Sequence, residues 1–83
     1  MYYTYILESE ISGRLYIGQT NNLEERLFRH NNDQNRSTKG RGPWRLIFST
    51  NFETRTEAIE LERKLKRFKN PHKVRIWITN QTG

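Results

Sequence analysis

The stretch Tyr2-Tyr3-Thr4-Tyr5-Ile6-Leu7, followed by Arg14-Leu15-Tyr16-Ile17-Gly18, decides the fold of this chain. Both stretches are rich in β-branched and aromatic residues, which is typical of strands. Residues 8–13 between them are polar and end in glycine, which predicts the loop of an antiparallel hairpin. If the two ends of this loop pair with each other, Tyr5 lies directly opposite Tyr16 on one face of the hairpin.

Two downstream segments carry the signals that begin helices. Asn22 stands at a cap position with Glu25 three residues later, and leucines at helical spacing follow until the helix ends at residues 31–33. Thr54 opens a second capping-box sequence, and apolar residues then recur at helical spacing to about residue 69. The sequence therefore predicts two helices.

The segments around these helices complete the predicted fold. Residues 34–43 are polar and basic and contain glycine, which predicts a mobile loop, and residues 44–52 alternate apolar and polar side chains as a third strand does. Residues 74–78 are ambiguous between a short helix and an edge strand. The order strand, strand, helix, strand, helix predicts an α+β fold, a three-stranded antiparallel sheet flanked by helices.

Length and composition limit the class of protein. The chain has 83 residues, and residues 1–83 are expected to form a single domain. Cysteine is absent, which excludes disulfides, thiolate metal sites and a cysteine nucleophile, and fits a reducing compartment. No apolar run reaches the roughly 18 residues of a membrane helix, and the N-terminus has no signal-peptide pattern. We therefore expect a soluble cytoplasmic protein, without a membrane partner, that is a monomer or a weak dimer.

The net charge of +6 is concentrated at the C-terminal end. Residues 63–83 contain no acidic residue. Such a one-sided block of positive charge favours a polyanion, nucleic acid above all, as the partner, while a solvated helix face is the alternative interpretation. The positive residues of this block are Arg63, Lys64, Lys66, Arg67, Lys69, Lys73 and Arg75.

Three polar residues lie at positions that the core does not explain. Arg26 and His30 are four residues apart, so both project from one face of the first helix, near the two hairpin tyrosines. Glu62 lies at the edge of the apolar stripe of the second helix. Taken alone, Arg26 and His30 are better explained as solvent-exposed side chains, and Glu62 as the ion-pair partner of Lys66.

Several short motifs together resemble the GIY-YIG nuclease domain, and in particular its small stand-alone bacterial branch. The resemblance covers nearly the whole chain. It implies a three-stranded antiparallel sheet flanked by helices, and hydrolysis of phosphodiester bonds in nucleic acid that depends on Mg²⁺ or Mn²⁺. The motifs are Tyr3-Thr4-Tyr5, Tyr16-Ile17-Gly18, Asn22 to Leu27, Ser37-Thr38-Lys39-Gly40, Pro43-Trp44 and Glu57 to Lys66.

The resemblance also implies roles for individual residues. Tyr5 and Tyr16 correspond to the two motif tyrosines, Arg26 to the helix arginine and Glu62 to the metal-binding glutamate, while His30 falls where relatives carry His or Tyr. The chain departs from the family pattern at Gln19, where several nucleases have Lys, and the late asparagine of the family has Asn70 as its nearest candidate, with Asn80 behind it.

The chemistry of the reaction explains these residue types. Hydrolysis adds negative charge to the phosphate, which Arg26 and a metal held by Glu62 would stabilise. The attacking water needs a base, for which Tyr5, Tyr16 and His30 are candidates. The pairing that we favour has a tyrosine taking the proton and His30 orienting it or relaying charge.

We therefore expect a metal-dependent endonuclease that cleaves DNA in repair or recombination, with a protein partner that supplies specificity. The alternatives are a non-catalytic nucleic-acid-binding module of the same fold and a protein-interaction domain. Residues expected to bind nucleic-acid phosphates are Arg36, Lys39, Arg41, Arg63, Lys66, Arg67 and Lys69.

Overall fold

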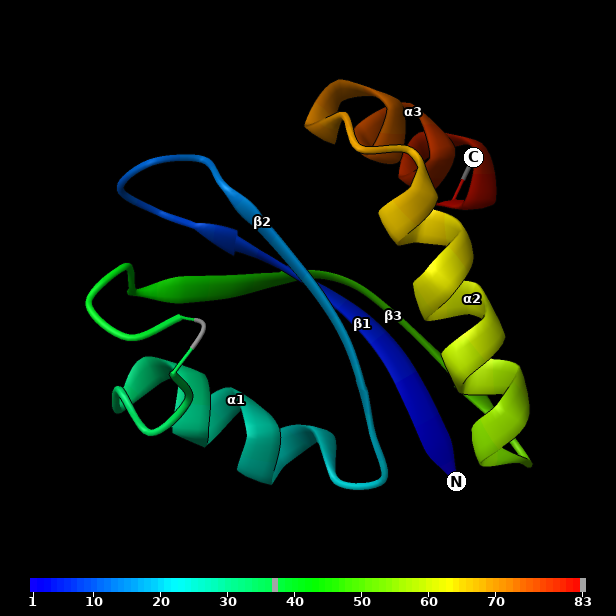
Figure 1. Ribbon diagram of the computed structural model, residues 1–83, viewed down its shortest axis with the longest axis horizontal. Coiled ribbons are helices and arrows are strands. Elements are labelled where there is room, and N and C mark those ends of the chain that lie inside the picture. Colours follow the sequence, from blue (N-terminus) through cyan, green and yellow to red (C-terminus); the bar gives the residue numbers. More distant parts are fainter. Residues whose placement is uncertain (37, 83) are drawn as a thin grey trace.

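A computed structural model describes residues 1–36 and 38–82 of the chain; Ser37 and Gly83 lie outside the described residues. The predicted α+β fold is confirmed, because three antiparallel strands form one sheet and helices cover it (Figure 1). The elements are β1 (Tyr2–Ser9), β2 (Leu15–Thr20), α1 (Leu23–Asn31), β3 (Trp44–Phe52), α2 (Arg55–Arg67) and α3 (Pro71–Thr82).

The hairpin forms, but its predicted register is wrong by two residues. Tyr5 lies opposite Gly18, and Tyr16 lies opposite Leu7. The reason is that β1 continues to Ser9, whose side-chain oxygen accepts hydrogen bonds from two backbone N–H groups of the loop at 3.2 and 3.1 Å and so moves the turn along the chain. An even shift preserves the faces of a strand. The two tyrosines therefore stay on one face, as diagonal instead of direct neighbours.

The central strand β1 separates two apolar layers, since the sheet has the order β2-β1-β3. On one face, Tyr5 and Leu7 pack with Trp44 under helix α1. On the other face, Ile6 packs with Leu65 of α2 and Val74 of α3. Figure 1 shows α1 apart from α2 and α3, with the sheet between them. Alternation along β1 thus produces a helix–sheet–helix arrangement.

Local signals begin all three helices. Asn22 caps α1 by accepting a hydrogen bond from the N–H of Glu25, and Thr54 caps α2 in the same way. The ambiguous residues 74–78 are helical in α3, which starts at Pro71 directly after α2 has ended. Asn70 supports this start, since its side-chain oxygen accepts the N–H of His72 at 2.9 Å.

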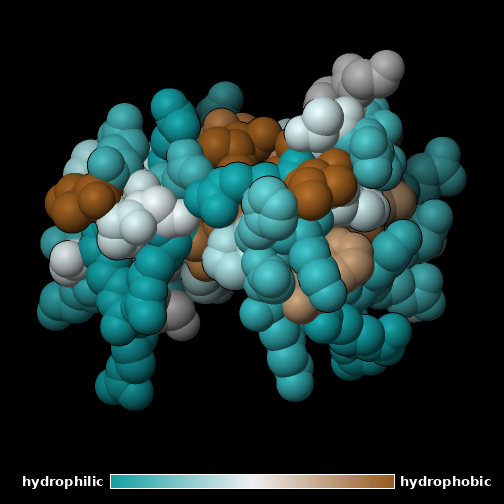
Figure 2. All heavy atoms as spheres, turned by 90° about the horizontal axis from the view of Figure 1, so that it is seen from above, coloured by the Kyte–Doolittle hydropathy of each residue, from teal (hydrophilic) through white to brown (hydrophobic). Residues whose placement is uncertain are grey.

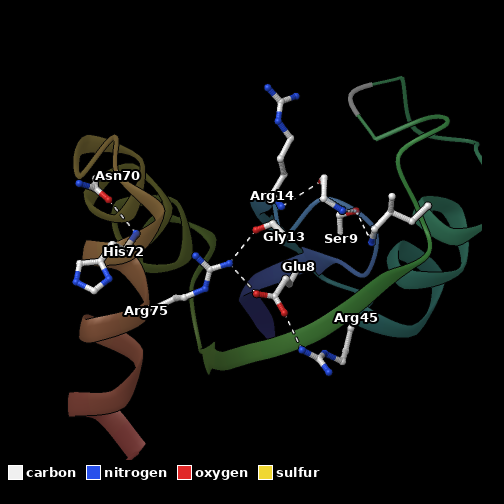
Figure 3. A network of polar contacts seen from close by, with 10 residues as sticks. Glu8, Ser9, Gly13, Arg14, Arg45, Asn70, His72 and Arg75 are labelled. Atoms are coloured by element: carbon white, nitrogen blue, oxygen red, sulfur yellow. Dashed lines mark hydrogen bonds and ion pairs between the residues drawn. The ribbon is translucent and has the colours of Figure 1, made fainter.

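A carboxylate in β1 joins the hairpin to β3 and α3 (Figure 3). The two oxygens of Glu8 each lie 2.7 Å from a guanidinium nitrogen, one of Arg45 and the other of Arg75. Arg75 also donates to the carbonyl of Gly13 at 2.8 Å. These arginines hold the pKa of Glu8 below its usual range. One cation of the C-terminal basic block, Arg75, is therefore partly exposed and held in an ion pair of the fold.

The face shown in Figure 2 is mainly hydrophilic, and its hydrophobic residues appear as separate patches. Ile11, in the hairpin loop, is the most exposed of the large apolar side chains among the described residues, at 77%. Within the part of the chain that the structure describes, no helix has the length and apolar character needed to cross a membrane.

Candidate active site

Tyr5 and His30 form a buried hydrogen-bonded pair between the sheet and helix α1. The Tyr5 hydroxyl lies 3.0 Å from Nε2 of His30, and both residues are 0% exposed. The end of the Tyr5 ring fills the space above Gly18 of β2. A Cβ atom at position 18 would lie 2.7 Å from the Tyr5 hydroxyl oxygen. The glycine of the second motif thus makes room for the tyrosine of the first.

The segment between α1 and β3, predicted to be a mobile loop, is attached to this pair through Thr38. Its hydroxyl lies 2.8 Å from Nδ1 of His30, and the residue is 0% exposed. Trp44 donates from Nε1 to the Thr38 carbonyl at 3.2 Å. The prediction of a mobile loop rested on the polar composition of residues 34–43 alone. In the structure, the buried imidazole of His30 gives Thr38 a polar partner, which holds this part of the loop inside the protein.

His30 is neutral at physiological pH. Burial, together with the positive charge of Arg26, lowers its pKa to about 4. A neutral imidazole has one nitrogen that donates and one that accepts. His30 therefore stands between two hydroxyl groups, those of Tyr5 and Thr38, without carrying a charge that the interior would have to accommodate.

Tyr5 is a poor phenolate in this environment. Burial raises its pKa most, the neighbouring Tyr16 raises it further, and Glu62 adds a smaller effect in the same direction. Arg26 lowers it, through its positive charge and through a side-chain hydrogen bond, but does not compensate for burial. Since Glu62 acts on Tyr5 across space, the second helix brings its carboxylate to the same region as Arg26 of the first.

Tyr16 is the tyrosine of the site that reaches the surface. Its ring centroid lies 4.7 Å from that of His30 and 6.2 Å from that of Tyr5. Unlike those two residues it is half-buried, and it lines a cleft of about 390 Å³ together with Lys66, Lys69 and Asn70. Of the three candidate bases, Tyr16 is thus the one that solvent touches.

Glu62 has the chemistry of a magnesium ligand. Its side chain is 19% exposed and forms an ion pair with Lys66, with 2.6 Å between Oε2 and Nζ. Both readings of this residue from the sequence, the ion pair and the metal ligand, are therefore compatible with its position. Mg²⁺ prefers oxygen ligands and retains several waters, so one carboxylate suffices to hold it beside a phosphate. The described residues contain no group of three or more His, Asp or Glu side chains that could hold a metal.

A second oxygen lies near the turn of α2 that carries Glu62. The side-chain oxygen of Gln19 is buried and has no hydrogen-bond partner among the described residues. Gln19 pairs with Thr4 in the sheet, and the Thr4 hydroxyl donates to the carbonyl of Ala58, one helical turn before Glu62. A buried oxygen without a partner fits a bound water or a hydrated cation. The donor set at this edge of the sheet therefore fits a magnesium ion.

The predicted phosphate-binding residues divide into groups. Lys66 and Lys69 lie beside Tyr16 in the larger cleft, and Arg41 lies beside it in a second cleft of about 280 Å³. The sequence did not single out Arg14, which lines that second cleft from the start of β2. The sequence predicted Arg14 as the first residue of the second strand, whereas the structure places it just before β2. The remaining predicted residues are exposed and line neither cleft: Arg36, Lys39, Arg63 and Arg67.

Comparison with known proteins agrees with this geometry. A model of the GIY-YIG catalytic domain matches residues 1–75. The chain therefore belongs to the GIY-YIG family, a nuclease superfamily, and nuclease-type activity follows from that membership.

Its relatives include small bacterial proteins of the UPF0213 group. The UPF0213 protein CPE1444 of Clostridium perfringens is 39% identical over 77 residues, which are 92% of this chain and 82% of that protein. The UPF0213 protein SSP2268 of Staphylococcus saprophyticus is 34% identical over 76 residues, 90% of this chain and 92% of that protein. The solution NMR structure of the UPF0213 protein BH0048 from Bacillus halodurans is similar with a TM-score of 0.50 and 35% identity, covering 81% of this chain and 72% of that one.

Proposed function

We propose that this protein is a metal-dependent endonuclease that hydrolyses phosphodiester bonds in DNA, with a role in repair or recombination. One observation carries the proposal: β1, β2, α1 and α2 bring Tyr5, Tyr16, Arg26 and Glu62 into one region, close enough for the last three to act on the ionisation of Tyr5. Separate segments converging on one cluster of polar groups beside a cleft are typical of an active site.

Each residue has a distinct role in the proposed reaction. Arg26 presents a planar guanidinium that matches phosphate oxygens, and its contact with Tyr5 fixes its direction. Glu62 would hold Mg²⁺ or Mn²⁺, which when bound supplies positive charge to the phosphate and the leaving oxygen. When a metal ion binds Glu62, the ion pair between Glu62 and Lys66 would open. Lys66 would then be free to bind a phosphate of the DNA.

Tyr16 is the residue to which we assign contact with the attacking water. Tyr5 and His30 are completely buried, so a water at the cleft does not reach them in this conformation. The Tyr5–His30 pair instead has a supporting role. Its imidazole packs against the ring of Tyr16, and its tyrosine positions Arg26. Tyr5→Phe removes the contact that aligns Arg26 and should lower cleavage in part, whereas Tyr16→Phe should abolish it. Equal loss of cleavage in both variants would return the role of base to the Tyr5–His30 pair.

The two clefts beside Tyr16 outline a path for the DNA backbone. Arg14 and Arg41 lie at one end of this path, and Lys66 and Lys69 at the other. Contacts of this kind bind phosphates without reading sequence. Replacing Lys69 or Arg14 by alanine should weaken DNA binding on every sequence and lower the slope of log K against log salt by about one for each residue.

The experiment that tests the function uses single-stranded, duplex and branched DNA, with Mg²⁺, Mn²⁺ or EDTA. Glu62→Gln removes the proposed metal ligand, and Glu60→Gln is the matched control, since it removes the same charge from an exposed position of the same helix. Metal-dependent cleavage that is lost in Glu62→Gln and kept in Glu60→Gln supports the proposal. Cleavage that survives in Glu62→Gln contradicts it.

A second function is a nucleic-acid-binding module that keeps the fold without turnover. Gln19, at the position where the family resemblance implies a lysine in several nucleases, favours it, as does the use of the Asn70 side-chain oxygen to cap α3. DNA binding that weakens with salt, without cleavage of any substrate under any metal condition, would establish this function instead.

A further inference from the structure

Thr38 is held rigidly in a segment that is otherwise largely exposed. Its N–H donates to the carbonyl of Asn35 at 3.2 Å, and its own carbonyl accepts from the N–H of Arg41 at 3.1 Å. The same carbonyl accepts from Nε1 of the buried Trp44 at 3.2 Å. The backbone of Thr38 is thereby fixed, and its hydroxyl meets Nδ1 of His30 at 2.8 Å with both residues 0% exposed.

The contacts around Tyr5 decide which nitrogen of His30 carries the hydrogen. Arg26, which acts on Tyr5 through its charge, has only donors, so it leaves the Tyr5 hydrogen free to point to Nε2 of His30, 3.0 Å from the Tyr5 oxygen. A neutral imidazole that accepts at Nε2 carries its hydrogen on Nδ1. The hydroxyl of Thr38 then accepts that hydrogen, and its own hydrogen faces the carbonyl of Asn35, 3.5 Å away.

We propose that Thr38 is a positioning residue of the candidate active site, which accepts the Nδ1 hydrogen of His30 and so keeps Nε2 as the acceptor for Tyr5. In the opposite tautomer, His30 and Arg26 would both donate to the Tyr5 oxygen and compete for it. The tautomer set by Thr38 thus leaves that oxygen to Arg26 and aligns the guanidinium. The catalytic part of this proposal rests on the proposed nuclease function, whereas the tautomer is a property of the fold.

The test compares three variants that change buried threonines. Thr38→Val removes the hydroxyl with little change of shape, and Thr38→Ser restores it. Thr4→Val is the matched control: Thr4 is also 0% exposed, and its hydroxyl donates to the carbonyl of Ala58 at 2.7 Å on the opposite face of the sheet. Thermal unfolding of each variant shows whether the two valine replacements cost comparable stability.

Two readouts separate positioning from structure. Imidazole ¹⁵N chemical shifts should place the hydrogen on Nδ1 of His30 in the wild type, in Thr38→Ser and in Thr4→Val, and should show a loss of that tautomer in Thr38→Val. Cleavage of DNA at saturating substrate should fall about 10-fold to 100-fold in Thr38→Val, the range typical for a residue that orients a functional group. It should be restored in Thr38→Ser, with DNA affinity unchanged.

The outcomes distinguish this proposal from the proposed function. A hydrogen on Nε2 in the wild type, or an unchanged tautomer in Thr38→Val, overturns it. Equal loss of cleavage in Thr4→Val overturns the catalytic part, because stability alone would then explain the effect. If the wild type cleaves no DNA, the nuclease function fails while the tautomer measurement still decides whether Thr38 orients His30.

Discussion

Replacing Gly18 by alanine should destabilise the protein through the Tyr5 ring. The new Cβ would lie 2.7 Å from the Tyr5 oxygen, 2.8 Å from its Cζ and 3.0 Å from Cε1 of Tyr16. Tyr16 is half-buried and can move, but Tyr5 is completely buried and hydrogen-bonded to His30. Overpacking of this kind costs about 1–3 kcal/mol. The lower backbone entropy of alanine in the unfolded chain returns about 0.4–1 kcal/mol, which leaves a net loss centred on about 1 kcal/mol.

Urea unfolding, followed by the fluorescence of Trp44 and Trp77, measures this loss. The same replacement in a Tyr5→Leu background is the matched comparison, because leucine does not reach position 18. There the clash with Tyr5 is absent and the half-buried Tyr16 can move away from the new Cβ, so the entropic gain dominates and Gly18→Ala should be neutral or stabilising. A Gly18→Ala variant as stable as the wild type would refute the reasoning, as would an equal loss in both backgrounds.

Three further predictions concern charged and titratable groups. Because burial depresses the pKa of His30 to about 4, the unfolded chain binds more protons than the folded protein between pH 6.5 and 4. The free energy of unfolding should therefore fall by up to about 3 kcal/mol as the pH drops through this window. Denaturation at several pH values would measure this fall, which should be smaller in His30→Gln. Glu62→Gln should change the free energy of unfolding by less than about 0.5 kcal/mol, because its pairing with a largely exposed Lys66 contributes little, so a large loss of stability would undermine its use as an activity probe. Glu8→Gln should cost about 1 kcal/mol, since Arg45 and Arg75 are also partly exposed, and unchanged thermal stability would contradict a structural role for this pair.

The parts of the fold that depend on local chemistry could be predicted from the sequence. Asn22 and Thr54 cap helices by contacts to residues three positions away, and such contacts can be seen in the sequence alone. The hairpin register could not be predicted, because it depends on how the side chain of Ser9 organises the loop. The helical state of residues 74–78 was undecided for a similar reason: a short apolar run fits either element, and its packing on Leu65 and Ile6 involves distant parts of the chain.

The sequence predicted which residues belong to the candidate site better than it predicted how they are placed and buried. The spacing of Arg26 and His30 places them on one helix face, and both act on the Tyr5 region in the structure. Neither the burial of His30 nor its contact with Thr38 could be predicted, because this contact joins a helix to a polar segment eight residues later. The sequence also could not tell which of the two strand tyrosines reaches the surface, because Tyr5 and Tyr16 lie in strands of similar composition.

The central place of β1 has a consequence for how the protein is made. Tyr2 pairs with Phe52, so β1 receives its second neighbour only after β3, which follows it in the chain, has been synthesised. At about 5–20 residues per second, the 34 residues between Ser9 and Trp44 take roughly 2–7 s. During this time one edge of β1 is unpaired, and the apolar side chains on its two faces are not yet fully packed. Assembly of the native chain therefore waits for its last strand, and mutations that slow the closure of β3 should reduce the yield of folded protein in cells even where the finished molecule is stable.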